Sequence, residues 1–417
     1  PTVLVPRFIA ATLAFIALNG AIAASPLGSP QISGLSGEDF CLSDTIKREG
    51  KPSSWWLARA YQLGRPEIVV CGSSQIGGLQ AADANLTGKA VDFVENHHCP
   101  TIEKGLEERL GTGAPYVFLS ALPGAMISDH FAIARALYRE KGAPPLVVLT
   151  ISPRDFIDNS LPCAGSTEPY RYFSRFSDLS AYTNLAFNKP WSRLEYFTSN
   201  QIPARRLETM VTTAWQNTID RLLPSFETKE ASPGERALAG EVDGKQQIQK
   251  QLKFVMGGYE GNIRPGQAVL TPNLPQIFVD NSRDYRRRYR NTHPDTYDVQ
   301  MRYMQEFLSY LKQENCRVLV LGMPLTANNR EILDGKFWQR YLQDIEKTCR
   351  KNDSRFLNLI ADPRFNNSDF CDTVHLNAAG GKKLADIVAE TVCGTPELRA
   401  ALTECKNSIA GKAPLTR

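Results

Sequence analysis

The chain has 417 residues, of which 42% are hydrophobic and 22% charged, and its formal net charge is +4 at pH 7. These values are those of a globular protein, so they exclude general disorder and a membrane protein with many spans. The small net charge is spread along the chain, which argues against a nucleic-acid-binding protein. The length allows two or three domains of roughly 150 residues, or one large domain with insertions.

The first 25 residues contain an uncharged, mostly apolar run, residues 8–24. A membrane-spanning helix needs about 20 apolar residues, so this run fits an N-terminal membrane helix with Arg7 on the cytoplasmic side. The membrane helix is the preferred interpretation, and a cleaved signal segment is the alternative, because residues 21–23 have the small-x-small pattern of a cleavage site. Either interpretation exports the rest of the chain and predicts a location outside the cytoplasm.

Export permits disulfide bonds, and nine cysteines are an odd number, so at least one is free or pairs outside the chain. Cys393 and Cys405 are close in sequence, with a turn between them, and are the first pair to test. His97, His98 and Cys99 are adjacent, but adjacent residues rarely converge on one metal ion. We therefore expect surface histidines there, no metal site and no cofactor.

Residues 26–65 are rich in Gly, Ser and Pro and read as a linker. Beyond them, short apolar runs alternate with helical patterns, and such runs suit parallel strands covered on both faces. The five runs are residues 67–71, 116–119, 146–151, 317–321 and 356–360. The alternation predicts one α/β domain over residues 66–405, with a doubly wound parallel sheet of five strands and a tail at residues 406–417.

One helix between the strands carries apolar residues at the 3–4 spacing of a buried face. They are Met301, Met304, Phe307, Leu308 and Leu311.

A large, mainly helical insertion is predicted at residues 160–295, between the third and fourth strands. It includes an amphipathic segment at residues 207–214 and a polar stretch at residues 229–245. It ends in an arginine cluster, which consists of Arg283, Arg286, Arg287, Arg288 and Arg290. The cluster is either a solvated helix face or a docking patch for an anionic polymer or lipid headgroups.

A serine turn, Gly72-Ser73-Ser74-Gln75, directly follows the first strand. A serine at a strand-to-helix turn lies at the carboxyl edge of the sheet, where ligands of such folds bind. The helix N-terminus there also offers backbone N–H groups to a developing oxyanion. Such turns are common, so the motif alone also fits an ordinary capped turn.

A second motif, Asp372-Thr373-Val374-His375, follows the fifth strand. The spacing of three lets the Asp372 carboxylate orient the His375 imidazole, which can then take the proton of Ser74. His375 is the one histidine of the five that has such a partner motif. If the two motifs form one site, Ser74 Oγ lies within roughly 2.6–3.2 Å of His375 Nε2.

Together these motifs resemble the SGNH (GDSL-type) hydrolase superfamily. Residues 72–74 look like its Gly-Asp-Ser block, and the resemblance implies that Ser74 is the nucleophile and Asp372 and His375 its triad partners. It also implies that the backbone N–H groups of Ser74 and Gly124 form an oxyanion hole. The implied fold is the flavodoxin-like form of the doubly wound sheet.

The third family block, normally Gly-x-Asn-Asp, departs from the family pattern. The matching stretch is residues 152–155, in which Arg154 stands where the family has its oxyanion asparagine. Arg154 either donates to the oxyanion in its place or forms a structural ion pair with Asp155.

Gly-Ser-Ser behind an N-terminal membrane segment resembles the DltD group of this superfamily. Those proteins sit on the outer face of the membrane and cooperate with a membrane-bound O-acyltransferase in decorating cell-wall polymers. Residues 122–129, 152–159 and 323–330 also resemble an uncharacterised cyanobacterial SGNH-like family. The resemblance implies a cell-envelope protein on the extracytoplasmic face.

Two functions are therefore expected as alternatives. The first is a serine esterase or O-acyltransferase that acts on acyl esters of a cell-envelope polysaccharide or other acylated polymer. The second is a non-catalytic accessory module that partners a membrane-bound O-acyltransferase and binds through its cleft or its arginine cluster.

Overall fold

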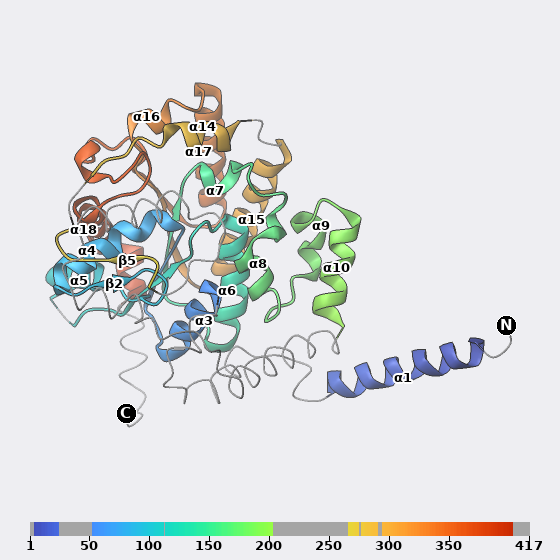
Figure 1. Cartoon of the computed structure of the whole chain (residues 1–417). Coiled ribbons are helices and arrows are strands. Elements are labelled where there is room, and N and C mark those ends of the chain that lie inside the picture. The colour runs from blue at the N-terminus through green and yellow to red at the C-terminus, as the bar shows by residue number, and fades with distance from the viewer. Residues whose placement is uncertain are drawn as a thin grey trace, which may run out of the picture.

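The computed structural model describes residues 4–24, 52–111, 113–202, 266–274, 277–290 and 294–402. A sheet of five parallel strands with helices on both faces forms its centre (Figure 1). The strands are β1 (Ile68–Gly72), β3 (Val117–Ala121), β4 (Leu146–Ile151), β6 (Arg317–Gly322) and β7 (Arg355–Asn358). Their order is β3-β1-β4-β6-β7. Counted along the chain, this is the 2-1-3-4-5 order of flavodoxin-like sheets. The predicted α/β fold with a five-stranded parallel sheet is confirmed.

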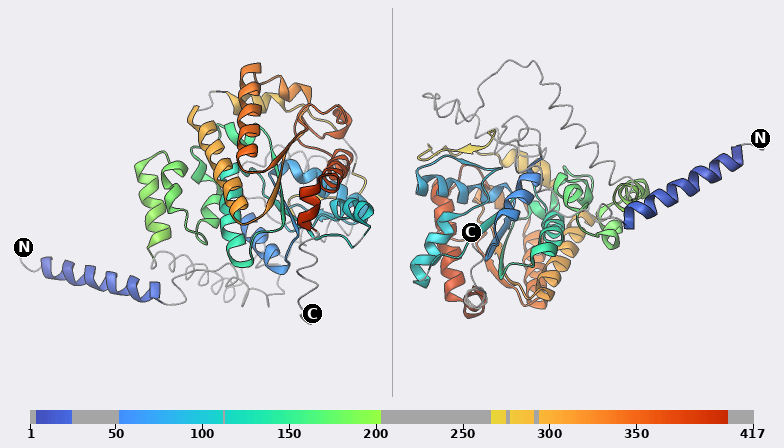
Figure 2. Two further views of the ribbon diagram at one scale, coloured as in Figure 1. Left: turned by 180° about the vertical axis from the view of Figure 1, so that it is seen from behind. Right: turned by 90° about the horizontal axis from the view of Figure 1, so that it is seen from below.

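The central strands are apolar on both sides because two cores lie on the two faces of the sheet. In β1, Val69 and Cys71 belong to one core, whereas Ile68 and Val70 belong to the other. The first core is covered by α3 (Ser53–Leu63), α6 (Ile127–Lys141), α15 (Pro294–Gln313) and α17 (Gly335–Lys351). The second is covered by α4 (Gly77–Thr87), α5 (Pro100–Leu110) and α18 (Ala378–Gly394), and Figure 2 shows both layers.

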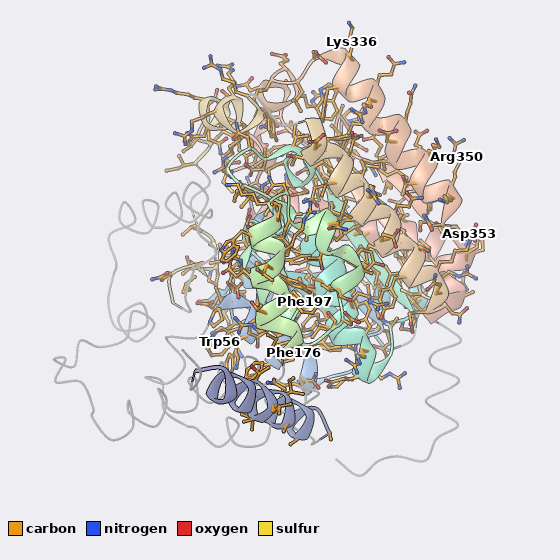
Figure 3. The ribbon with its side chains drawn as sticks, turned by 90° about the vertical axis from the view of Figure 1, so that its right-hand side faces the viewer. Trp56, Phe176, Phe197, Lys336, Arg350 and Asp353 are labelled. Carbon is orange, nitrogen blue, oxygen red and sulfur yellow. The ribbon has the colours of Figure 1, made fainter. Side chains whose placement is uncertain are left out.

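The helices of the first layer bury the faces that their sequences indicate. On α15, the predicted apolar face is buried at Met304, Phe307, Leu308 and Leu311, and Met301 packs against the same core. On α17, Tyr341 and Ile345 are buried, whereas Lys336 and Arg350 are exposed and point away from the body (Figure 3).

The segment between β4 and β6 is mainly helical in its described parts. It contains α7 (Arg154–Ile157), α8 (Glu168–Phe173), α9 (Thr183–Ala186), α10 (Pro190–Gln201) and α14 (Ser282–Tyr289). One short strand in it, β5 (Val269–Leu270), pairs antiparallel with β2 (Val91–Asp92). The predicted amphipathic segment at residues 207–214 and polar stretch at residues 229–245 lie outside the described residues.

At the N-terminus, α1 (Leu4–Ala24) covers the run for which the sequence predicts an anchor or signal. It lies apart from the α/β body in Figure 1. Within the described ranges, no helix is both long enough and apolar enough to span a membrane. The predicted membrane helix has no support in the structure and stays a prediction.

The linker prediction for residues 26–65 is wrong for Ser53–Leu63, which form the helix α3. This helix packs on the sheet and buries Leu57 and Tyr61 in the first core. The Gly/Ser/Pro-rich composition of the preceding residues hid this apolar i, i+4 pair. Cys405 lies outside the described residues, so the predicted pairing with Cys393 does too. No disulfide bond joins any two of the described cysteines, which are Cys71, Cys99, Cys163, Cys316, Cys349, Cys371 and Cys393.

Candidate active site

The serine turn lies at the carboxyl edge of the sheet, between two neighbouring strand ends. Ser73 follows β1, and Ser74 begins a short 3₁₀ helix (Ser74–Ile76) that leads into α4. The strand before it ends at Gly72, which is in register with Ala121 at the end of β3. Ser74 is partly exposed, so its hydroxyl is accessible from this edge.

Two glycines bring the far end of the chain to this turn. The start of α18 packs against the start of α4, and a Cβ atom on Gly381 would lie 1.8 Å from the carbonyl oxygen of Gly78. A Cβ atom on Gly78 would in turn lie 2.7 Å from Leu376 Cβ. Because neither glycine has a side chain, the backbones approach closely and carry His375, next to Leu376, up to Ser74.

The predicted triad is assembled as a chain of hydrogen bonds. Ser74 Oγ lies 2.9 Å from His375 Nε2, within the expected range. His375 Nδ1 lies 2.7 Å from Asp372 Oδ2. The Asp372 carboxylate accepts, so Nδ1 carries the ring proton, and in the neutral ring Nε2 is free to accept the proton of Ser74.

Burial increases along this chain from the serine to the aspartate. His375 is 6% exposed and Asp372 is 0% exposed. The second oxygen of the buried carboxylate, Oδ1, accepts hydrogen bonds of 2.8 Å from the backbone N–H groups of Val374 and His375. These bonds replace lost water and fix the carboxylate relative to the imidazole.

The structure adds one residue that the sequence interpretation missed. Asn281, between β5 and α14, donates from Nδ2 to Asp372 Oδ2 at 2.9 Å. Its Oδ1 accepts from the backbone N–H of Thr373 at 3.1 Å and also from the Thr373 hydroxyl. Asn281 lies 91 residues before Asp372 in the sequence, so no local motif connects the two. The only sequence feature near Asn281 is the arginine cluster that begins two residues later.

Gly124 lies in the turn after β3, at the same edge as Ser74. The backbone of Gly124 has φ of 71°, in the left-handed region that favours glycine. The turn is tied to β1, because Leu122 donates its backbone N–H to the carbonyl of Gly72 at 3.3 Å. The adjacent strands thus place Gly124 and Ser74 on neighbouring loops at one edge of the sheet.

Arg154 is buried, and it holds the turn that contains Gly124. Its guanidinium donates 2.8 Å hydrogen bonds to the carbonyl oxygens of Gly124 and Ala125. It also pairs with Asp158 at 3.0 Å, and less closely with Asp155 at 3.5 Å. These contacts favour the structural interpretation of Arg154, with Asp158 rather than Asp155 as its nearer partner.

Asp155 instead accepts hydrogen bonds from the backbone N–H and the hydroxyl of Ser152, at the end of β4. Burial raises the pKa of the Asp155 carboxyl to about 6.

The arginine cluster lies on α14 and the residue after it, next to the triad of Ser74, His375 and Asp372. Four of its members, Arg283, Arg286, Arg287 and Arg290, are exposed. Arg288 is half-buried over the Tyr285 ring. Burial raises the pKa of Tyr285, and the negative charge of Asp372 adds to this shift, which indicates that α14 lies beside the triad.

The other described histidines serve structural roles. His97 is buried, its ring stacks on Phe118, and its Nδ1 lies 2.8 Å from the carbonyl oxygen of Leu119. The prediction of a surface histidine is therefore wrong for His97. His98 is half-buried and pairs with Glu103 at 2.8 Å.

His130 is also buried, which lowers its pKa to about 3. Among the described residues, no three of His, Cys, Asp or Glu come together as a metal site.

No family model matches the chain, and no curated protein matches it.

Proposed function

We propose that the protein is an SGNH-type serine esterase or O-acyltransferase of the cell envelope. The observation that carries this proposal is the continuous hydrogen-bonded chain from Ser74 Oγ through His375 to Asp372. The flavodoxin-like strand order and the serine turn after the first strand also agree with the superfamily that the motifs resemble. The envelope location rests on the predicted export of the chain, and the acylated substrate on the resemblance to DltD.

In this mechanism, Ser74 Oγ attacks the carbonyl carbon of an acyl ester while His375 Nε2 takes the hydroxyl proton. The Asp372 carboxylate stabilises the imidazolium that forms. The tetrahedral intermediate then collapses, and the leaving alcohol takes the proton from His375. Water or a sugar hydroxyl next attacks the acyl group on Ser74, again with His375 as the base, and the free serine is restored.

We propose that the backbone N–H groups of Ser74 and Gly124 donate hydrogen bonds to the oxyanion of the tetrahedral intermediate. One donor in such a site is worth about 2.7–4 kcal/mol of transition-state stabilisation. Arg154 supports this hole through the Gly124 carbonyl. We assign it the task of fixing the Gly124 peptide rather than that of a third donor.

A second candidate function is a non-catalytic accessory module that partners a membrane-bound O-acyltransferase. The exposed arginines of the cluster favour it, because four cations on one short segment suit an anionic polymer. It also accounts for the absence of the family's oxyanion asparagine.

An active-site fluorophosphonate probe tests the first function. We expect the wild type to be labelled and Ser74→Ala not to be labelled. Ser73→Ala is the matched control, since Ser73 is the adjacent, buried serine, and it should keep the label. Equal labelling of Ser74→Ala and the wild type would remove the nucleophile assignment.

A cellular assay separates the two functions. If the enzyme function holds, Ser74→Ala and His375→Ala abolish the modification of the envelope polymer. If both variants preserve it and charge reversal at Arg286, Arg287 and Arg288 abolishes it, the accessory function is favoured.

A further inference from the structure

The amide of Asn281 has one orientation that satisfies its neighbours. The backbone N–H of Thr373 can only donate, so the atom of Asn281 that faces it, at 3.1 Å, must be the carbonyl oxygen. The amide nitrogen then points at Asp372 Oδ2, where it donates at 2.9 Å. The network therefore fixes the orientation of the amide, which X-ray density alone rarely distinguishes.

This contact is made to the oxygen that faces the catalytic histidine. Asp372 Oδ1 is held by backbone N–H groups of its own loop, Val374 and His375. Asp372 Oδ2 accepts from His375 Nδ1 and from Asn281 Nδ2. Both Asn281 and Asp372 are at most 5% exposed, so water does not readily replace a lost amide donor.

The segment around Asn281 is itself fastened to the catalytic loop. Val279 donates its backbone N–H to the carbonyl of Cys371 at 2.8 Å and forms a parallel bridge with Asp372. Asp280 accepts from Asn328 at 2.9 Å. Three successive residues of the insertion thus contact the catalytic loop or the α16 helix (Ala327–Arg330) beside it.

We propose that Asn281 is a positioning residue for Asp372, and that the insertion thereby supplies part of the active site. It holds Asp372 Oδ2 in line with His375 Nδ1 and so keeps the imidazole in the tautomer that can accept the proton of Ser74. The role in turnover rests on the proposed acyl-transfer function. The role in holding the carboxylate does not depend on it.

Turnover of an aryl ester such as p-nitrophenyl acetate tests the kinetic role. We expect Asn281→Ala to lower kcat by about 10- to 100-fold with little change in KM, which is the range for loss of one hydrogen bond to a charged group. Asn281→Asp keeps the size of the side chain but replaces the donor with an acceptor, so it should lower kcat at least as far. If Asn281 acted only by packing, Asn281→Asp would have the kcat of the wild type.

Asn329→Ala is the matched control, because Asn329 is a buried amide that contacts the Thr373 hydroxyl at 3.3 Å and not the carboxylate. It should leave kcat within about twofold of the wild type. Equal losses of kcat in Asn281→Ala and Asn329→Ala would overturn the proposal, since both would then report only a loosened loop.

Proton NMR of the folded variants decides the geometric claim independently of catalysis. The His375 Nδ1–H proton, bonded to Asp372, should resonate far downfield in the wild type and in Asn329→Ala. In Asn281→Ala it should shift or disappear by exchange. An unchanged resonance in Asn281→Ala overturns the positioning role. Failure of Ser74 labelling with a changed resonance would instead contradict the proposed function alone.

Discussion

The contacts of Arg154 differ from those of the residue that stands at its position in the family that the motifs resemble. In the family that the motifs resemble, this position carries an asparagine that donates to the oxyanion. Here the guanidinium hydrogen-bonds the carbonyl of Gly124, whose N–H is the proposed donor. It is neutralised by Asp158 within the same turn, as a buried cation requires.

A second single residue, His97, predicts how the free energy of unfolding changes at acidic pH. Burial lowers its pKa to about 4, whereas an unfolded histidine has a pKa near 6.5. Below pH 6.5 the unfolded chain therefore binds a proton that the folded protein does not. The stability that His97 contributes is present above about pH 6.5 and is lost as the pH falls toward 4, by about 1.4 kcal/mol per unit.

Removing this histidine should flatten the acid limb of the stability curve. We expect the free energy of unfolding of His97→Asn, measured by urea titration, to fall less than that of the wild type between pH 6.5 and 4. The asparagine amide takes the place of the Nδ1–H that faces Leu119.

The neighbouring residue His98 gives the control for this prediction. Its hydrogen bond to Glu103 raises its pKa, so the stability it contributes is present below pH 6.5 and lost as the pH rises. His98→Asn should therefore reduce the loss of stability as the pH rises above 6.5, and leave the fall between pH 6.5 and 4 close to that of the wild type. Parallel curves for wild type and His97→Asn would show that His97 is protonated equally in both states.

At the scale of elements, the crossing of α4 and α18 determines whether the site forms. The two helices begin at the two motifs, and they meet backbone to backbone at Gly78 and Gly381. Gly381→Ala places a methyl group against the Gly78 carbonyl and must push the helices apart. We expect a loss of stability of about 1–3 kcal/mol, typical of overpacking, together with a large loss of fluorophosphonate labelling.

Gly394→Ala, at the other end of α18, is the matched control. A Cβ atom there meets nothing within 4 Å, so this variant should keep its labelling and be neutral or slightly stabilised. Thermal unfolding and labelling rates measure both effects. Normal labelling of Gly381→Ala would mean that close helix contact is not what joins the two motifs.

The strands β1, β3, β4 and β6 were predictable because they are buried on both faces, whereas the edge strand β7 is only partly buried. All five runs in the sequence end within two residues of the observed strands. The Ser74, Asp372 and His375 motifs were predictable for a related reason: in a parallel sheet the polar residues that follow the strands collect at one edge. Asn281 and the α3 helix were not predictable. The contact of Asn281 depends on how a long insertion folds back, and the composition of the preceding stretch masked α3.

At the scale of the whole molecule, two backbone pairings join the insertion to the α/β domain, in addition to the packing of α8 on α3 and α6. Its β5 strand pairs with β2, and its residues Val279 and Asn281 hydrogen-bond to the loop of Asp372. The arginine cluster follows within two residues of the second junction. An anionic polymer bound to the cluster would thus lie near the Ser74 edge, so the cationic surface and the triad would share one face of the molecule.

We propose that Ser74 and His375, which are 301 positions apart in the sequence, form one catalytic unit. Mass spectrometry of the protein, quenched in acid during turnover of p-nitrophenyl acetate, tests it most directly. We expect an acetyl group on the peptide that contains Ser74, and none in Ser74→Ala. An acetyl group on a different residue, or ester turnover that Ser74→Ala leaves unchanged, would contradict it.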